Sequence, residues 1–363
     1  MILLNDLKAQ HDSIKEELER AINSVISKSQ FIGGEALDEF EENFSNYCQK
    51  GHCIGTSSGT SALYTVLKCS GIKSGDEVIV PVHTFIATAF AVSLLGAKPV
   101  FADVNENDFL INADFIENKI TPKTKAIIPV HLYGNVCDME KIKLTAEKYN
   151  LKIIEDCAQA HGSAYKGIPV PITDIGCFSF YPAKNLGALG DAGAIVTSSK
   201  ELAEKCRKFI NHGRKDKYLH ISEGFNFRLD NLQAAILDVK LKYLESWINK
   251  KRSIANQYNK ELMNSIAVPF VDEAVKHSYH LYVIKSKNRD ALKKHLEING
   301  IETGIHYPLP LHLQPALSYL GYKKGDFPVA ESLAEQILSI PMYPFLKDEE
   351  QDKIISAINN FSN

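Results

Sequence analysis

Hydrophobic residues along the chain follow two patterns, a helical spacing in some segments and short continuous runs in others. Near the N-terminus, residues 12–27 and 35–47 carry apolar side chains at helical spacing, and the break Phe31-Ile-Gly-Gly34 separates them. From His52 onward, short apolar runs alternate with helical segments. Runs such as EVIV, AIIPV and KIIE are typical of strands covered on both faces of a parallel sheet. The pattern predicts an α/β fold with a mostly parallel central sheet flanked by helices.

The alternation assigns the first part of the chain element by element. Strands are expected at His52–Thr56, Glu77–Val80, Pro99–Ala102, Lys125–Val130, Leu151–Glu155, Ile175–Phe180 and Ala194–Thr197. Helices are expected at Ser61–Cys69, Ile86–Leu95, Asp138–Tyr149 and Lys200–Ile210.

A long helical pattern from about Asn231 to Met263 bridges this part and a smaller one. The smaller part is predicted to hold strands at Tyr279–Lys285 and Ile301–Ile305, and helices at Asp290–Glu297 and near 315–320, 328–339 and 347–361. The chain has 363 residues, and single cores usually stop growing at about 250–300 residues. We therefore predict a large domain of residues 1–245 and a smaller C-terminal α+β domain of residues 246–363.

Composition narrows the class of protein. The 41 basic and 44 acidic residues give a formal charge of −3. The chain therefore lacks the excess of basic residues that is typical of nucleic-acid-binding proteins, and we expect no nucleic-acid partner. Seven scattered cysteines without a C-x-x-C pair argue against a disulfide framework or a zinc site, and we expect no metal. The N-terminus lacks the apolar core of a signal peptide, and the most apolar stretch, Phe85 to Ala97, is shorter than the ~20 residues of a spanning helix. We expect a cytoplasmic protein without a membrane partner.

A candidate phosphate site lies in Gly55-Thr-Ser-Ser-Gly-Thr-Ser-Ala62, between a predicted strand and a predicted helix. Gly59 would let the backbone approach a ligand closely, and Thr60 and Ser61 suit a helix N-cap. A helix N-terminus offers unpaired N–H groups and the positive end of the helix dipole, which together attract phosphate. The alternative is an ordinary helix cap with spare serines.

Two further candidates follow predicted strands. Phe85 lies where open α/β sheets place their ligands, and it is either a core residue or a stacking platform for a flat cofactor. Asp156 comes directly after an apolar run, and a buried carboxylate there needs a cationic partner such as a protonated pyridine nitrogen. Gln159 could reach the phenolic oxygen of the same ring. The alternative for Asp156 is a helix N-cap.

Lys184 lies in a glycine-containing loop after the apolar run that ends at Phe180, and Ser179 precedes it by five residues. By itself such a lysine is most often a solvated loop residue. Together with a phosphate site, a stacking aromatic side chain and a strand-end aspartate, it completes the parts of a pyridoxal phosphate site. In such a site the lysine binds the cofactor aldehyde, and the aspartate keeps the pyridine nitrogen protonated.

Five ordered motifs resemble those of the DegT/StrS family of sugar-nucleotide aminotransferases, which are fold-type I pyridoxal phosphate enzymes. They are G-T-S-S-G-T, P-x-H-T-F-x-A-T, E-D-x-A-Q-A-x-G, S-F-Y-P-x-K-N-L-G-A-x-G-D and G-x-N-x-R-L-D. The likeness covers the chain from Leu7-Lys-Ala-Gln10 to Ile305-His-Tyr-Pro-Leu-Pro-Leu-His312.

The resemblance implies a role for each matching residue. Lys184 would hold the cofactor and move a proton between the substrate Cα and the cofactor C4′. Asp156 would pair with the ring nitrogen, Gln159 would contact the ring oxygen, and Phe85 would stack on the ring.

The resemblance also implies how the phosphate is held. Gly59, Thr60 and Ser179 would bind it within one subunit. In this family the asparagine of G-x-N-x-R reaches the phosphate of the neighbouring subunit, so Asn226 implies a homodimer with shared active sites. The role of Arg228 stays open. Some relatives carry histidine in place of the lysine and are dehydratases, so Lys184 favours transamination.

Substrate residues are expected in the loop after the lysine motif and in the small domain. The candidates are Tyr181, Lys217, His306 and Tyr307. The segment 212–218 resembles relatives that make 3-amino-3,6-dideoxyhexoses on a dTDP carrier, and Lys217 would suit a diphosphate. Lys217 could equally be a solvated loop charge. Glutamate is the expected amino donor, with 2-oxoglutarate as its product.

The leading hypothesis is therefore a dTDP-3-keto-6-deoxyhexose aminotransferase, which would supply amino sugars for lipopolysaccharide O-antigens or other surface glycans. The first alternative is amination at C4 of a keto sugar on a UDP, GDP or dTDP carrier. The second alternative, from another class, is a pyridoxal phosphate-binding regulatory protein without turnover.

Overall fold

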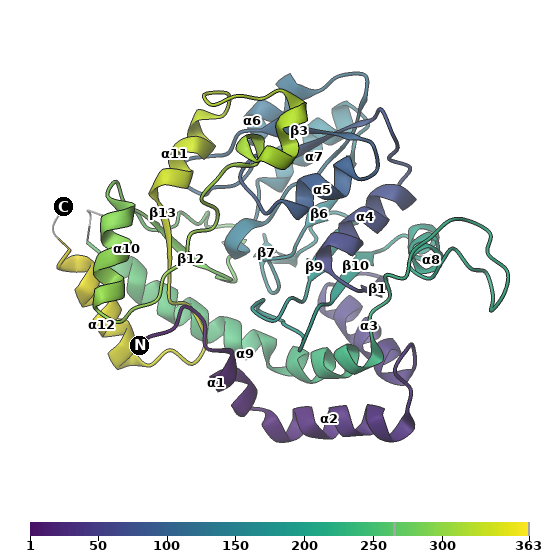
Figure 1. The fold of residues 1–363 in the computed structure, drawn as a ribbon, viewed down its shortest axis with the longest axis horizontal. Helices are drawn as coiled ribbons and strands as arrows, with labels where there is room; N and C mark the ends of the chain where they lie inside the picture. The colour runs from purple at the N-terminus through teal and green to yellow at the C-terminus, as the bar shows by residue number, and fades with distance from the viewer. Residues whose placement is uncertain (264–265, 362–363) are drawn as a thin grey trace.

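The computed structural model describes residues 1–263 and 266–361 (Figure 1). Four parallel strands form one half of its central sheet, in the order β3-β2-β4-β5. Their bounds are Lys98–Ala102 for β3, Glu77–Pro81 for β2, Thr124–Ile127 for β4 and Lys152–Ile153 for β5. These strands are the short apolar runs of the sequence, and β2 is buried from Val78 to Pro81.

The other half has the order β1-β10-β9-β6. Its strands are β1 (His52–Thr56), β10 (Gly193–Thr197), β9 (Gly176–Ser179) and β6 (Glu155–Asp156). β6 follows β5 after one residue, and Val130 pairs in parallel with Asp156, so the two halves meet there. Strand β10 is antiparallel to both of its neighbours, whereas β6 and β9 are parallel. The prediction of a mostly parallel sheet is confirmed.

Helices cover the sheet, and α9 runs below it in Figure 1. Those before α9 are α1 (Leu7–Asp12), α2 (Lys15–Lys28), α3 (Glu35–Tyr47), α4 (Gly59–Cys69), α5 (Ala87–Ser93), α6 (Ala113–Ile116), α7 (Met139–Lys148) and α8 (Lys200–Phe209). Short 3₁₀ helices lie at Glu117–Lys119 and Leu132–Gly134. Helix α9 spans Asn231–Glu261.

The C-terminal part contains a two-stranded antiparallel sheet with helices around it. Its elements are β12 (Tyr282–Lys285), α10 (Arg289–Ile298), 3₁₀ helices at Leu311–Leu313 and Pro315–Leu320, α11 (Pro328–Gln336), β13 (Ile337–Ile340) and α12 (Asp348–Asn359). A small three-stranded sheet is formed by β7 (Ala164–Tyr165), β8 (Ile168–Pro169) and β11 (Val275–Lys276).

Helix α9 contributes to two hydrophobic clusters. Leu244 and Ile248 pack in the large cluster around the central sheet, whereas Ile254 and Tyr258 pack in the cluster of the C-terminal part. The helix is continuous across the predicted domain boundary at residue 245. The boundary itself stays a prediction. None of the helices in the described residues combines the length and apolar character needed to cross a membrane.

Two predicted elements of the C-terminal part are wrong. The segment 301–305 makes only isolated bridges, Ile301 with Ile2 and Gly304 with Ser339. The helix predicted over 328–339 ends at Gln336, and the apolar run that follows is strand β13. A short apolar run fits a buried strand as well as the end of a helix, so periodicity alone could not separate the two.

Candidate active site

A cavity of about 550 Å³ lies where the carboxyl ends of the central strands face the C-terminal part. This volume is typical of a small-molecule site. The predicted residues that line it are Gly59, Thr60, Phe85, Asp156, Gln159, Ser179, Tyr181, Lys184, His306 and Tyr307. Lys217 and Asn226 are the two predicted residues that lie outside it. The structure thus brings together residues that are far apart in the sequence.

The N-terminus of α4 opens into this cavity. The helix is capped by Ser58, whose hydroxyl accepts from Ser61 N–H at 3.1 Å, while Ser61 Oγ accepts from Ser58 N–H at 2.9 Å. The cap is therefore Ser58 rather than the predicted Thr60 or Ser61. First-turn N–H groups have no partner within their own helix, so those of Gly59 and Thr60 are available to an anion.

Gly59 is required by the approach of β9 to this helix. A Cβ atom on Gly59 would lie 2.7 Å from Ser179 Cβ, too close for two carbon atoms. The absence of a side chain therefore brings the Ser179 hydroxyl next to the first turn of α4. Helix N–H groups and a hydroxyl converge at one end of the cavity, which fits a phosphate group.

Asp156 ends β6 at the centre of the sheet and is buried. Its Oδ2 accepts from the Thr88 hydroxyl at 2.9 Å, and its Oδ1 accepts from Ala158 N–H at 3.1 Å. Burial raises the pKa of the Asp156 carboxyl, whereas these hydrogen bonds and the charge of Lys184 oppose the rise. No α-helix begins at Asp156, so the alternative of a helix N-cap is wrong.

Lys184 lies on the loop after β9 and is partly buried in the cavity wall. Burial lowers the pKa of its ammonium to about 8, although the charge of Asp156 acts in the opposite direction. An amine with such a pKa is neutral in a useful fraction of molecules near neutral pH. Neutral amine is the form that attacks a carbonyl carbon, so Lys184 is suited to bond an aldehyde.

Gln159, Tyr307 and Phe85 form the side of the cavity between these groups. Gln159 Oε1 accepts from Tyr133 N–H at 2.7 Å, and its Nε2 donates to the Tyr307 hydroxyl at 3.2 Å. The rings of Phe85 and Tyr307 lie 5.7 Å apart. Phe85 is 53% exposed, so the alternative that it is a core residue is wrong. An exposed ring beside an amide donor suits a flat polar ligand.

Besides Ser58, the residues of this site that the sequence did not predict include Thr88, Tyr133 and His280. Thr88 is the last residue of the motif P-x-H-T-F-x-A-T, so the sequence motif could have identified it as a site residue. Tyr133 and His280 carried no signal, because their contacts join distant segments. The Tyr133 hydroxyl donates to the backbone carbonyl of His306, and His280 lines the cavity.

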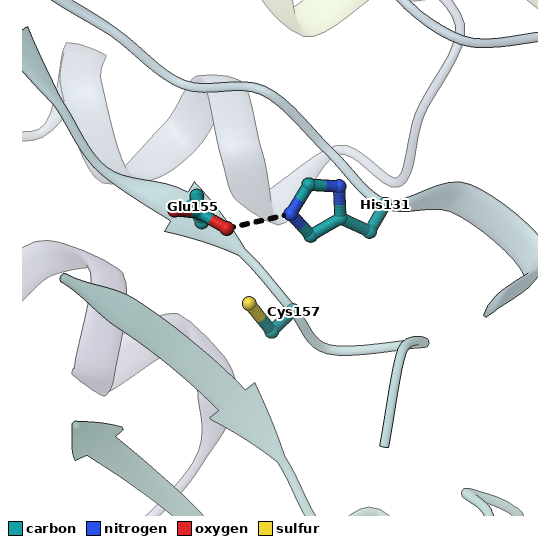
Figure 2. A group of neighbouring side chains, drawn as sticks. All are labelled: His131, Glu155 and Cys157. Carbon is teal, nitrogen blue, oxygen red and sulfur yellow. Dashed lines mark hydrogen bonds and ion pairs between the residues drawn. The ribbon is translucent and has the colours of Figure 1, made fainter. Parts of the chain in front are cut away.

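The side chains of His131, Glu155 and Cys157 lie close together (Figure 2), and Glu155 and Cys157 flank Asp156 in the sequence. His131 Nε2 lies 2.9 Å from Glu155 Oε2, and all three side chains are buried. Glu155 also accepts hydrogen bonds from the backbone of Ile172 and Thr173. Burial acts to raise the pKa of Glu155, but its bonds to His131 and Thr173 lower it overall. This network ties neighbouring segments to the strand that carries Asp156.

Asn226 and Lys217 lie on the exposed segment 212–226. Asn226 pairs with Asn211 in an isolated bridge, and the Lys217 ammonium lies 5.3 Å from the ring of Tyr218. Arg228 donates to Asn211 Oδ1 at 2.7 Å and so supports the base of this segment. Within one subunit, the segment does not contribute to the cavity.

The donor set fits pyridoxal phosphate. The α4 N-terminus and Ser179 match its phosphate, Asp156 matches a protonated pyridine nitrogen, Gln159 Nε2 can donate to the ring oxygen, and Lys184 matches the aldehyde. The buried Asp156 is the strongest evidence for this cofactor, because burial raises the pKa of its carboxyl and so disfavours the ionised form. A cationic ring nitrogen would compensate for its burial.

Residues 12–359 match the model of the DegT/DnrJ/EryC1/StrS aminotransferase family. The chain belongs to this family. The DegT/DnrJ/EryC1/StrS assignment confirms the resemblance seen in the sequence, and it establishes an aminotransferase whose cofactor is pyridoxal phosphate.

Individual relatives of this aminotransferase match over nearly their whole length. The chain is 43% identical to the dTDP-3-amino-3,6-dideoxy-alpha-D-galactopyranose transaminase of Aneurinibacillus thermoaerophilus, with 99% of each chain covered. It is also 43% identical to a protein of Geobacillus stearothermophilus named pleiotropic regulatory protein, with 98% of this chain and 97% of that protein covered. The crystal structure of S. venezuelae DesV matches with a TM-score of 0.97 at 40% identity, covering 98% of this chain and 97% of that one. This match confirms the predicted fold class.

Proposed function

We propose that this aminotransferase moves the amino group of glutamate to C3 of a dTDP-3-keto-6-deoxyhexose, giving a dTDP-3-amino-3,6-dideoxyhexose and 2-oxoglutarate. The main support for transamination is that Lys184 and Asp156 line the same cavity. The likeness of segment 212–218 to makers of 3-amino sugars and the identity to a dTDP-3-amino sugar transaminase support the substrate.

When bound, pyridoxal phosphate supplies an aldehyde for the amino group and a ring that accepts electrons from the substrate Cα. Asp156 would keep the ring nitrogen in its protonated form. Lys184 Nζ, with its lowered pKa, would take a proton from the substrate Cα and return it at the cofactor C4′. Ser179 and the first turn of α4 would hold the phosphate, and Phe85 would lie against the ring.

The sugar nucleotide would enter from the side lined by Tyr181, His306 and Tyr307. Tyr181 is 56% exposed and stands at the rim of the cavity, next to the lysine loop. His306 and Tyr307 reach the cavity from the C-terminal part, where His306 Nδ1 is held by Ser339 Oγ at 2.8 Å. These side chains can bind hydroxyl and carbonyl oxygens of a sugar.

We further propose a homodimer in which Asn226 and Lys217 act in the partner's cavity. Both lie outside the cavity of their own subunit, on an exposed segment with the apolar side chains of Leu219, Ile221 and Phe225. An exposed apolar patch of this kind favours contact with another chain. Asn226 would then donate to the phosphate, and Lys217 would bind the diphosphate as a point charge.

A direct test is glutamate-dependent amination of a panel of 3-keto and 4-keto sugars on dTDP, UDP and GDP carriers, with the amino carbon of each product located by NMR. Preferred conversion of the dTDP-3-keto sugar supports the proposal. Preference for a 4-keto sugar would establish C4 amination, and preference for UDP or GDP would change the carrier.

The second candidate is a regulatory protein that binds the cofactor without turnover, as the name of the Geobacillus relative suggests. The retained Lys184 and its lowered pKa favour turnover. Failure to aminate any sugar, with the cofactor firmly bound, would favour the regulatory candidate. The cytoplasmic location and the role in surface-glycan synthesis stay predictions.

A further inference from the structure

Helix α9 runs beneath the loop that carries Lys184 and contacts it at three points. Gln233 accepts from Leu189 N–H at 2.8 Å, Lys240 Nζ donates to the Gly187 carbonyl at 2.6 Å, and Lys251 Nζ donates to Asn185 Oδ1 at 2.8 Å. The first and last of these side chains are 18 residues apart, which is about five helical turns, so they share one face of α9.

Two of the three are buried lysines with neutral partners. Lys240 is 1% exposed and contacts His11 Nε2 at 2.9 Å besides the Gly187 carbonyl. Lys251 is 5% exposed, and its second acceptor is the His280 carbonyl at 3.4 Å. In the part of the chain that the structure describes, neither forms an ion pair. Burying an ammonium group against neutral acceptors costs folding free energy. An apolar side chain at the same position would therefore stabilise the fold better, if the role of the lysine were only structural.

Lys251 differs from Lys240 in where it holds the loop. Its acceptor, Asn185, is the residue directly after Lys184, and Asn185 Nδ2 donates to the Ser278 carbonyl at 3.0 Å. The Asn185 side chain is therefore fixed from two sides. A recess beside the main cavity is lined by Lys184, Asn185 and Lys251 together.

We propose that Lys251 is a positioning residue for the reaction, which fixes Asn185 and thereby the direction of the Lys184 side chain. The inference rests on the proposed role of Lys184. A lysine that leaves and rejoins the cofactor in each cycle needs a rigid anchor on its own backbone, because a small misplacement costs rate. Asn185, held between Lys251 and Ser278, supplies that anchor.

The test compares Lys251→Met with the matched control Lys240→Met, which removes a buried lysine bound to the same loop. The readouts are the single-turnover rate of the reaction with glutamate, the pH midpoint of the visible cofactor absorbance, and the melting temperature of the apoprotein. For Lys251→Met we expect a rate loss of about tenfold or more with little change in the glutamate concentration for half-saturation. The pH midpoint should rise, because a neighbouring cationic group is removed. For Lys240→Met we expect a loss below about threefold.

A double-mutant cycle that combines Lys251→Met with Asn185→Leu tests whether Lys251 acts through Asn185. If Lys251 acts through Asn185, the double variant is no slower than either single variant. Additive losses, equal losses in both lysine variants, or a Lys251→Met protein with wild-type rate and midpoint would overturn the proposal. Should Lys251→Met fail to fold, the comparison of Asn185→Leu with Lys240→Met decides, and equal rates would overturn it. If the wild-type protein does not react with glutamate, glutamate is not the amino donor. The pH midpoint of the cofactor absorbance would then still test the role of Lys251.

Discussion

The Thr88 hydroxyl donates to Asp156 Oδ2 at 2.9 Å and links helix α5 to the end of strand β6 inside the sheet. This hydrogen bond favours the ionised form of the carboxyl, whereas burial raises the pKa of Asp156. The ionised form is the one that can pair with a protonated pyridine nitrogen. We therefore expect Thr88 to favour cofactor binding through its hydrogen bond to Asp156.

Thr88→Val, which keeps the shape and removes the hydroxyl, should raise the pKa of Asp156 further. A hydrogen bond to a charged group contributes about 1.5–3 kcal/mol, so affinity for pyridoxal phosphate should fall by roughly tenfold to a hundredfold. Equilibrium titration of the apoprotein with the cofactor measures this. Thr88→Ser restores the donor and should bind nearly as tightly as wild type. Equal affinity of the Val and Ser variants would show that the hydroxyl has no such role.

Lys184→Ala should remove both turnover and the visible absorbance of the lysine-bound cofactor. In the proposed site the other residues would still hold the phosphate and the ring, so the cofactor should bind without a covalent bond and leave on gel filtration. The absorbance spectrum and an amination assay test this, with Lys217→Ala as a variant that keeps Lys184 and its spectrum. Amination by the Lys184→Ala protein would refute the assignment of the lysine.

Gly59→Ala should disturb the seat of the phosphate, because its Cβ would lie 2.7 Å from Ser179 Cβ. Overpacking of this kind costs about 1–3 kcal/mol of the free energy of unfolding. Denaturant unfolding and cofactor titration should both show the loss. The control is Gly51→Ala, where a new Cβ would meet Ser198 at an ordinary 3.8 Å. If both variants unfold at the same denaturant concentration, β9 and α4 are less tightly packed than described.

The parts of the site that the sequence predicted are those carried by strand ends and short motifs. Asp156 follows an apolar run and Lys184 a buried strand, and parallel strands bring their carboxyl ends to one edge of the sheet. The contacts that hold these residues could not be predicted in this way. Tyr133 and His306 are 173 residues apart, and Lys251 and Asn185 are 66 apart. Such pairs are set by packing between elements, which the pattern of one segment does not record.

Prediction of the fold has the same limit. Short apolar runs that alternate with helical segments predicted the central sheet, whereas β7, β8 and β11, each of two residues, were not predicted. A two-residue strand has no periodicity to detect, and its pairing depends on the segment opposite.

Lys251 should make the stability of the apoprotein depend on pH. Burial lowers the pKa of its ammonium from 10.5 to about 7, so between these values the unfolded chain binds more protons than the folded one. Stability from this group therefore rises with pH across that window and is lost as pH falls toward 7. In Lys251→Met the slope of unfolding free energy against pH should be smaller by up to about 1.4 kcal/mol per pH unit.

Denaturant unfolding of the apoprotein at several pH values from 7 to 10 measures that slope. Lys184 and Lys240, also with lowered pKa values, contribute slopes of the same sign in both proteins, so the difference isolates Lys251. Lys260→Met, at an exposed position on the same helix, should leave the slope unchanged. Identical slopes for wild type and Lys251→Met would mean that the ammonium is not desolvated.

The proposed shared active site predicts complementation between two inactive variants. Lys184→Ala lacks the catalytic amine, and Asn226→Ala should bind the cofactor weakly in the partner's cavity. In a mixed dimer, the Asn226→Ala subunit keeps its own Lys184, and the Lys184→Ala partner supplies an intact Asn226. One of the two cavities is then complete. Mixing the variants under subunit exchange should therefore restore activity, up to about a quarter of wild type for random pairing.

Activity of the mixture at limiting cofactor, compared with each variant alone, is the measurement. A control mixture of Lys184→Ala with Asp156→Ala tests two residues of the same cavity. Their mixed dimer contains no complete cavity, because Asn226 is intact in both subunits while each cavity lacks Lys184 or Asp156. Recovery in the first mixture and none in the second is expected. If neither mixture recovers activity, although differently tagged chains verify subunit exchange, Asn226 does not act in the cavity of the partner subunit.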